Sequence, residues 1–197
     1  MRISDDRYSR DRLRVDIALH FIRLEARTHT IREWTGLTDD RIRKLYRSYL
    51  HEGGHRIARH RGKSPRQASY FMRTERLRQE AAALAGLCCL LGLLETGSRR
   101  DGPRPAAVGR AASLCQAYAV YRAVVSAPAI GFEHAVLLVT LLARGNELCV
   151  GRCQGCGTLV IRDPLALGAP RCALCADAPA LEVAAATRAQ RMKAEDR

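Results

Sequence analysis

The sequence predicts a mainly α-helical protein with a small cysteine-rich module near its C-terminal end. Apolar residues recur at helical spacing through most of residues 1–146. From about residue 147 the composition changes to turn glycines between short β-favouring stretches, and four cysteines there form two C-x2-C pairs. We therefore expect a helical core over 1–146 that includes a helix-turn-helix-like segment (30–50) and a basic arm (51–66), a four-cysteine, zinc-ribbon-like module over 147–178, and a terminal helix or tail over 179–197.

The chain is long and apolar enough to bury a core. It has 197 residues, of which 47% are hydrophobic. Its 33 Lys and Arg against 20 Asp and Glu give a formal net charge of +13. Such an excess favours a polyanionic partner, either nucleic acid or an anionic membrane surface, and charge alone does not choose between them.

Membrane contact is not expected from the sequence. The first residues lack the apolar core of a signal peptide, and the longest apolar runs, around 81–94 and 135–143, are too short to span a bilayer. The cations of the arm lie in a Gly-rich stretch without an apolar insertion face. We expect a cytoplasmic protein, and in that reducing compartment its eight cysteines favour metal ligands or buried thiols over disulfides.

Residues 12–27 predict a helix that is apolar on two sides. Two stripes recur at helical spacing, one through Leu13, Ile17, Phe21 and Leu24, and the other through Val15, Leu19, Ile22 and Ala26. A helix of this kind needs two partners. Either both sides are buried in one core, or one side meets another subunit.

A short helix, a glycine turn and a longer helix are predicted over residues 30–50. Gly36 can make the tight turn, and Thr38 can cap the longer helix. Asp39 and Asp40 fall in its first turn, where negative charge complements the helix dipole. An apolar stripe follows at i, i+3, i+4 and i+7, formed by Ile42, Leu45, Tyr46 and Tyr49. This pattern is typical of a helix-turn-helix.

The remaining segments alternate between loop and helix. The basic arm reads HEGGHRIARHRGKSPR from His51 to Arg66 and has no helical period. Apolar residues at helical spacing predict helices over about 67–95, 106–126 and 132–144, with a break at 96–105. The helices of the first two thirds are expected to build the core.

Four cysteines have the spacing of a metal site. The two C-x2-C pairs are separated by fifteen residues, as when four thiolates surround one tetrahedral Zn²⁺, and consist of Cys153, Cys156, Cys172 and Cys175. Unrelated core thiols or reversible disulfides are the alternatives. Gly155 and Gly157 relieve the backbone of the first knuckle. Because four cysteines close the coordination shell, we predict one structural zinc ion per chain.

The other cysteines are not expected to bind the metal. Cys149 lies close to the first pair, but a C-x3-C arrangement would leave Cys156 outside the knuckle. Buried, inert thiols are expected for the cysteines in apolar helical text, Cys88, Cys89 and Cys115.

No catalytic constellation is apparent. The thiolates belong to the quartet, and His51, His55 and His60 lie in the flexible loop predicted for the basic arm. A nucleotide deaminase would need H-x-E and P-C-x-x-C, but an extra residue separates Pro170 from Cys172. We predict that the protein is not an enzyme.

A basic surface is predicted from the second helix of the helix-turn-helix into the arm. On that helix Arg41, Lys44 and Arg47 lie opposite the apolar stripe, as a groove-facing side requires. A charged helix face is often only solvated, but the adjoining arm adds uncompensated cations. The predicted DNA contacts are Arg41, Arg43, Lys44, Arg47, Arg56, Arg59, Arg61, Lys63 and Arg66.

Taken in order, these parts resemble the FlhC family, the zinc-containing partner of FlhD in a bacterial flagellar activator. The resemblance rests on DRIRKLYR at 40–47, SYFMRT at 69–74, AYAVYR at 117–122 and the cysteine quartet, and it spans roughly residues 10–178. It implies a hetero-oligomer with FlhD, binding to double-stranded DNA, contact with RNA polymerase, and zinc on Cys153, Cys156, Cys172 and Cys175.

Two other functions stay open at this point. FlhC-like activators also occur on conjugative elements, where they activate transfer genes instead of flagellar class II promoters. Alternatively, the chain is a zinc-ribbon adaptor whose basic arm binds RNA or an acidic protein.

Overall fold

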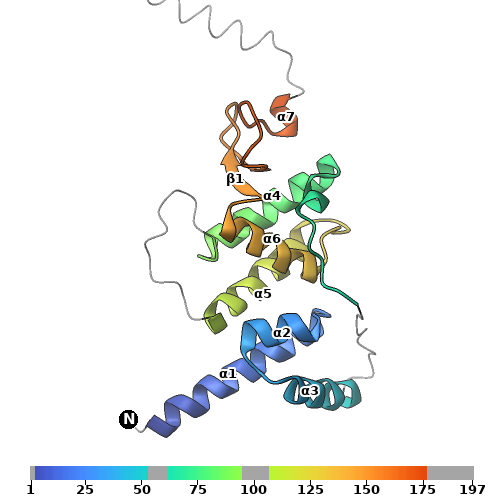
Figure 1. The fold of residues 1–197 in the computed structure, drawn as a ribbon, viewed down its shortest axis with the longest axis vertical. Coiled ribbons are helices and arrows are strands. Elements are labelled where there is room, and N and C mark those ends of the chain that lie inside the picture. The colour runs from blue at the N-terminus through green and yellow to red at the C-terminus, as the bar shows by residue number, and fades with distance from the viewer. Residues whose placement is uncertain (1–2, 53–61, 95–106, 177–197) are drawn as a thin grey trace, which may run out of the picture.

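The computed structural model describes residues 3–52, 62–94 and 107–176, and these ranges are mainly helical, as predicted (Figure 1). Several predictions fall outside the described residues, namely the arm residues Arg56, Arg59 and Arg61, the break at 96–105 and the terminal helix over 179–197. No helix within the three ranges is both long and apolar enough to cross a membrane.

The first helix is α1 (Ile3–Arg23), which starts earlier and ends earlier than predicted. The chain turns at Glu25, which has a φ of 59°. The Ala26 N–H donates to the Phe21 carbonyl at 2.9 Å and closes the helix. Because a non-glycine residue supplies this positive φ, no glycine marks the end of α1 in the sequence.

Both apolar stripes of α1 enter one core along its C-terminal half. Ile17, Phe21 and Ile22 are buried. The Phe21 ring meets the Phe132 ring edge-on at a centroid distance of 5.0 Å. The first half of the helix is different, because Leu13 keeps 47% of its surface exposed. Burial in a single core is therefore confirmed only for the second half.

The predicted helix-turn-helix-like segment is present as α2 (Thr28–Thr35) and α3 (Asp39–Glu52). Gly36 joins them with a φ of 71°, a left-handed conformation that glycine adopts without strain. On the inner face of α3, Ile42 and Tyr46 are buried, and the Tyr46 hydroxyl donates to the Ala26 carbonyl at 2.6 Å. The prediction that a loop begins at His51 is wrong, because α3 continues to Glu52, directly before two glycines in the sequence.

The predicted helix at 67–95 is two elements. A 3-10 turn, η1 (Ala68–Met72), precedes α4 (Glu75–Leu90). Thr74 separates them in an extended conformation, and its side chain accepts a hydrogen bond from the Leu77 N–H at 3.2 Å. The Thr-Glu pair at 74–75 was a helix-start signal that the periodicity masked.

Two more helices complete the helical part. α5 (Ala107–Val124) contacts α1 and α2 on one side and α4 on the other. α6 (Phe132–Arg144) has the predicted bounds and ends at Gly145, whose φ is 69°. α5 ends two residues before the predicted end, and Ala127 reverses the chain with a φ of 50°.

The connection between α5 and α6 is held by a buried carboxylate on α4. Glu80 is only 6% exposed. It accepts hydrogen bonds from the Tyr121 hydroxyl, from the Ala129 N–H at 2.8 Å and from Arg76 at 2.7 Å. Burial alone would raise the pKa of Glu80, but these three donors outweigh burial and leave the pKa below its ordinary value.

The cysteine-rich module contains the predicted hairpin. β1 (Cys149–Arg152) pairs antiparallel with β2 (Leu159–Arg162), and the short α7 (Ala173–Ala176) follows. β2 packs on α4, and Leu148 and Ile161 are buried in the common core. The hairpin therefore stands on the helical part with its turn pointing outward, at the opposite end of the molecule from the start of α1 (Figure 1).

Candidate functional site

The four predicted ligands lie together at the tip of the module. Cys153 follows β1 directly and Cys156 lies in the hairpin turn, whereas Cys172 directly precedes α7 and Cys175 lies within it. Their four Sγ atoms lie within 4.8 Å of one another. The quartet can therefore hold a metal ion, and among the described residues it is the one group of this kind.

Backbone hydrogen bonds shape the two knuckles. In the first, the Cys153 N–H donates to the Thr158 carbonyl at 2.8 Å and the Gly157 N–H donates to the Cys153 carbonyl at 2.9 Å. In the second, the Ala176 N–H donates to the Cys172 carbonyl at 2.8 Å. Gln154 joins the two, since its N–H donates to the Pro170 carbonyl at 2.9 Å. The sulfurs are therefore held by the main chain.

The first knuckle requires glycine at two positions, and the physical reason differs between them. Gly157 has a φ of +74°, so it supplies a left-handed turn. At Gly155 the reason is space, because a Cβ there would lie 2.8 Å from the Sγ of Cys175. The sequence predicted that both glycines relieve the backbone, but the close approach of the second knuckle to Gly155 could not be read from spacing.

The sulfurs are electrostatically unequal. The Cys172 N–H donates to the Sγ of Cys153 at 3.3 Å, and this bond, with those from other backbone N–H groups, lowers the pKa of Cys153 to about 6. Hydrogen bonding to Cys156, Cys172 and Cys153 raises the pKa of Cys175 to about 12. Four thiolates this close repel one another, so a bound cation is needed for all four to ionise.

The other cysteines lie outside the quartet. Cys149 is half-buried in β1 and is not one of the four clustered cysteines. Cys88 is buried, and burial raises its pKa to about 12. Cys89 and Cys115 were predicted to be buried but are only half-buried. Burial still raises the pKa of both, to about 12 for Cys115, so these thiols stay protonated and unreactive at neutral pH.

The outer face of α3 is basic. Arg43, Lys44 and Arg47 are exposed, opposite the buried Ile42 and Tyr46. Arg43 forms an ion pair with Asp40 at 3.0 Å, and Arg47 donates weakly to the Arg43 carbonyl at 3.5 Å. The Lys44 side chain has no ion pair with a described residue. These three cations remain accessible to a polyanion.

Arg41 is exposed as well, but it is paired with a residue of another helix. Its guanidinium donates two hydrogen bonds to Asp11 of α1, at 2.9 and 2.5 Å. The bond from Arg41 lowers the pKa of the Asp11 carboxyl. Arg41, which is also a predicted DNA contact, thus joins α3 to α1 while its side chain stays 47% exposed. Nothing in the sequence indicates this pair, whose partners are thirty residues apart.

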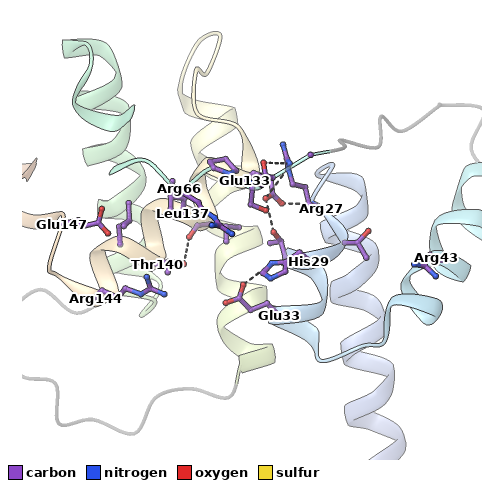
Figure 2. Close-up of a pocket in the computed structure, with 18 residues that line it drawn as sticks. Arg27, His29, Glu33, Arg43, Arg66, Glu133, Leu137, Thr140, Arg144 and Glu147 are labelled. Carbon is purple, nitrogen blue, oxygen red and sulfur yellow. Dashed lines mark hydrogen bonds and ion pairs between the residues drawn. The ribbon is translucent and has the colours of Figure 1, made fainter. Parts of the chain in front are cut away.

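The described end of the arm, residues 62–66, lies beside α2 and α6. Lys63 and Arg66 are exposed and belong to an irregular segment over 62–66. They line a groove between α2 and α6, together with Arg43 from α3 (Figure 2). The structure thus brings Lys63, Arg66 and Arg43 to one surface feature, and Arg43 also belongs, with Lys44 and Arg47, to the outer face of α3.

The chain matches no known protein-family model and no curated protein sequence. The FlhC resemblance therefore stays a prediction that rests on the sequence regions quoted above.

Proposed function

We propose that the protein is the DNA-binding subunit of a heteromeric transcription activator that works with FlhD and recruits RNA polymerase to flagellar class II promoters. The observation that carries DNA binding is the exposed basic face of α3, formed by Arg43, Lys44 and Arg47 after a glycine turn. FlhD, RNA polymerase and the promoter class come from the resemblance to FlhC.

We infer that the metal is zinc and that its role is structural. In a tetrahedral zinc tetrathiolate with bonds of about 2.3 Å, neighbouring sulfurs lie about 3.8 Å apart. The Sγ atoms of Cys156 and Cys172 are 3.6 Å apart, which fits such a shell. Four cysteine ligands leave no position for water, so Zn²⁺ would stabilise the hairpin without taking part in a reaction.

In the proposed mechanism, contacts with DNA phosphates position the protein on the promoter. Buried Ile42 and Tyr46 fix α3 against α1 and α2, so its outer face can dock against DNA without local rearrangement. Arg43, Lys44 and Arg47 would neutralise phosphates and release counterions. With about six phosphate contacts in the whole complex, affinity should fall by about a thousandfold between about 50 and 200 mM salt.

Footprinting of candidate promoter DNA, with and without FlhD, tests the proposal. A discrete protected site is expected, and the double variant Lys44→Ala, Arg47→Ala should weaken binding and reduce the salt slope by about 1 for each lost phosphate contact. Arg122→Ala is the matched control, because Arg122 is an exposed cation on α5, away from α3. Equal loss in both variants, or salt-insensitive binding, would count against this interface.

A second footprinting comparison tests which class of promoters the protein binds. Flagellar class II promoter fragments and promoter fragments of conjugative transfer genes can be footprinted in parallel. Protection of only the transfer-gene fragments would keep the activator mechanism and replace the flagellar assignment.

A protein-binding adaptor is favoured by one feature of the metal module. Three leucines near the metal ligands are largely exposed, with exposed fractions of 84% for Leu165, 101% for Leu167 and 85% for Leu174. Exposed apolar groups gathered in one small module mark contact surfaces. A metal-loaded protein that leaves no footprint on any promoter, yet binds a protein through these leucines, would support the adaptor instead.

A further inference from the structure

A groove of about 1040 Å³ crosses the helical part, and no residue of the cysteine quartet lines it (Figure 2). One wall is α2 with the residue before it, the opposite wall is the segment 62–66, and α6 forms the floor. This volume matches the upper range of small-molecule sites in proteins. None of its lining residues belongs to the metal centre, and Arg43 is the one lining residue that also belongs to the outer face of α3.

The floor is largely apolar. It is made by one stripe of α6, with Val136, Leu137, Thr140 and Leu141. Leu137 is half-buried and faces the groove, whereas the Thr140 hydroxyl is turned back to the Val136 carbonyl at 2.9 Å (Figure 2). Because Val136 and Leu141 are buried, Leu137 is the apolar side chain of the floor that a ligand can contact.

The walls are charged, and the charges are unevenly placed. Lys63 and Arg66 are exposed on one wall and have no ion pair with a described residue. Arg66 and Leu137 both line the groove (Figure 2). The carboxylates of Glu33 and Glu147 lie at other points of the lining. Arg43 and Arg144 also line the groove, and Lys63 and Arg66 are the two cations of the wall formed by residues 62–66.

Hydrogen bonds and an ion pair hold the basic wall of the groove in place. Glu133 accepts hydrogen bonds from the Arg27 N–H at 2.8 Å and from the Thr30 hydroxyl at 3.0 Å. The Arg27 guanidinium reaches across to the Lys63 carbonyl at 2.5 Å, while its Nε lies 3.9 Å from Glu133. That carboxylate is compensated by Arg27, so it does not cancel the charge of Lys63 and Arg66.

We propose that this groove binds a small amphiphilic anion, with its anionic group between Lys63 and Arg66 and its apolar body on Leu137. A compact ligand fits better than a nucleic acid strand, because Glu33 and Glu147 would repel phosphates that continued along the groove. The site goes beyond DNA binding, and its occupation does not depend on that function.

Calorimetric titration of the full chain with hexyl phosphate, inorganic phosphate and hexanol tests the proposal. Hexyl phosphate should bind saturably and at least about tenfold more tightly than either half-ligand, because burial of several methylenes adds to the charge contact. Equal affinity for hexyl phosphate and inorganic phosphate, equal affinity for hexanol, or no saturable binding would overturn it.

Substitutions in the groove test where hexyl phosphate binds. Arg66→Gln should weaken hexyl phosphate binding by about five- to tenfold, and Leu137→Ser should weaken it without changing the weak binding of inorganic phosphate. Arg122→Gln on α5 is the matched cation control and should bind like the wild type. Unchanged affinity in Arg66→Gln, with circular dichroism showing the wild-type fold, would overturn the site.

Duplex DNA separates this site from the proposed DNA interface. DNA should leave hexyl phosphate bound, and Arg66→Gln should retain wild-type DNA affinity. Displacement of hexyl phosphate by duplex DNA would assign the groove to the nucleic-acid interface and overturn the inference. Failure of footprinting alone would affect only the proposed function, because the titrations contain no DNA.

Discussion

At the scale of single residues, the candidate metal site depends on the absence of a Cβ atom at Gly155. The first knuckle allows the Sγ of Cys175 to approach because no Cβ stands in its way. Cysteine spacing predicted the four ligands, since ligand identity and interval are properties of the local chain. It could not predict which glycine the other knuckle touches, because that contact is made between segments twenty residues apart.

Gly155→Ala is expected to lower metal affinity by about tenfold or more, because the new methyl group would displace Cys175. Competition with a chromophoric chelator measures this affinity. Gly109→Ala is the matched control, since a Cβ at Gly109 meets nothing within 4 Å. Wild-type affinity in Gly155→Ala would show that the second knuckle can move away at little cost.

At the scale of elements, the chain reversal between α5 and α6 depends on α4. Glu80 is the shared acceptor of Tyr121, Ala129 and Arg76, so one carboxylate joins a helix to a connection about fifty residues later. Its folded-state pKa is lowered below the ordinary 4.5. Its ionised form therefore stabilises the fold fully above pH 4.5, and this stabilisation is lost as pH falls through the lowered pKa.

Glu80→Gln should reduce the free energy of unfolding at pH 7 by about 1 to 3 kcal/mol, because buried donors lose their charged acceptor. Urea unfolding at pH 7 and at several values below 4.5 measures the effect. The difference from the wild type should shrink as the pH falls. Glu75→Gln, on an exposed carboxylate of the same helix, should show no such convergence.

Helix existence was predictable and helix boundaries were less so. α6 had its predicted bounds because Gly131 and Gly145 flank a continuous apolar pattern. α1 was placed less well because Glu25, a residue type that rarely adopts a positive φ, ends it. The 67–95 segment was placed less well because continuous apolar periodicity masked the helix start at Thr74. The Arg41–Asp11 pair was unpredictable for another reason, since it depends on how α1 packs beside α3.

At the scale of the molecule, the metal module and the helical part share only part of their core. Leu148 and Ile161 pack with the helices, but the ligands lie beyond them at the tip. Metal binding to small modules of this kind contributes on the order of 10 kcal/mol. The module is therefore expected to depend on the metal more strongly than the helices do.

Chelation of the metal should abolish hydrogen-exchange protection in residues 149–176 while α1, α5 and α6 stay protected. Mass spectrometry of peptides from the chelated and reloaded protein measures this, and helical circular dichroism should fall only slightly. Cys153→Ser with Cys172→Ser should behave like the chelated protein. Cooperative loss of protection in the helices would mean that the module and the helical part unfold as one unit.

The hydrogen bond and ion pair between Arg27 and Glu133 have a consequence for synthesis of the chain. Its partners are 106 residues apart, and Glu133 supplies the acceptor for the Arg27 N–H and the Thr30 hydroxyl at the start of α2. A ribosome makes Arg27 long before it makes Glu133, at about 5 to 20 residues each second. The start of α2 must therefore wait several seconds for its acceptor, so the helix-turn-helix-like segment reaches its final form only late in translation.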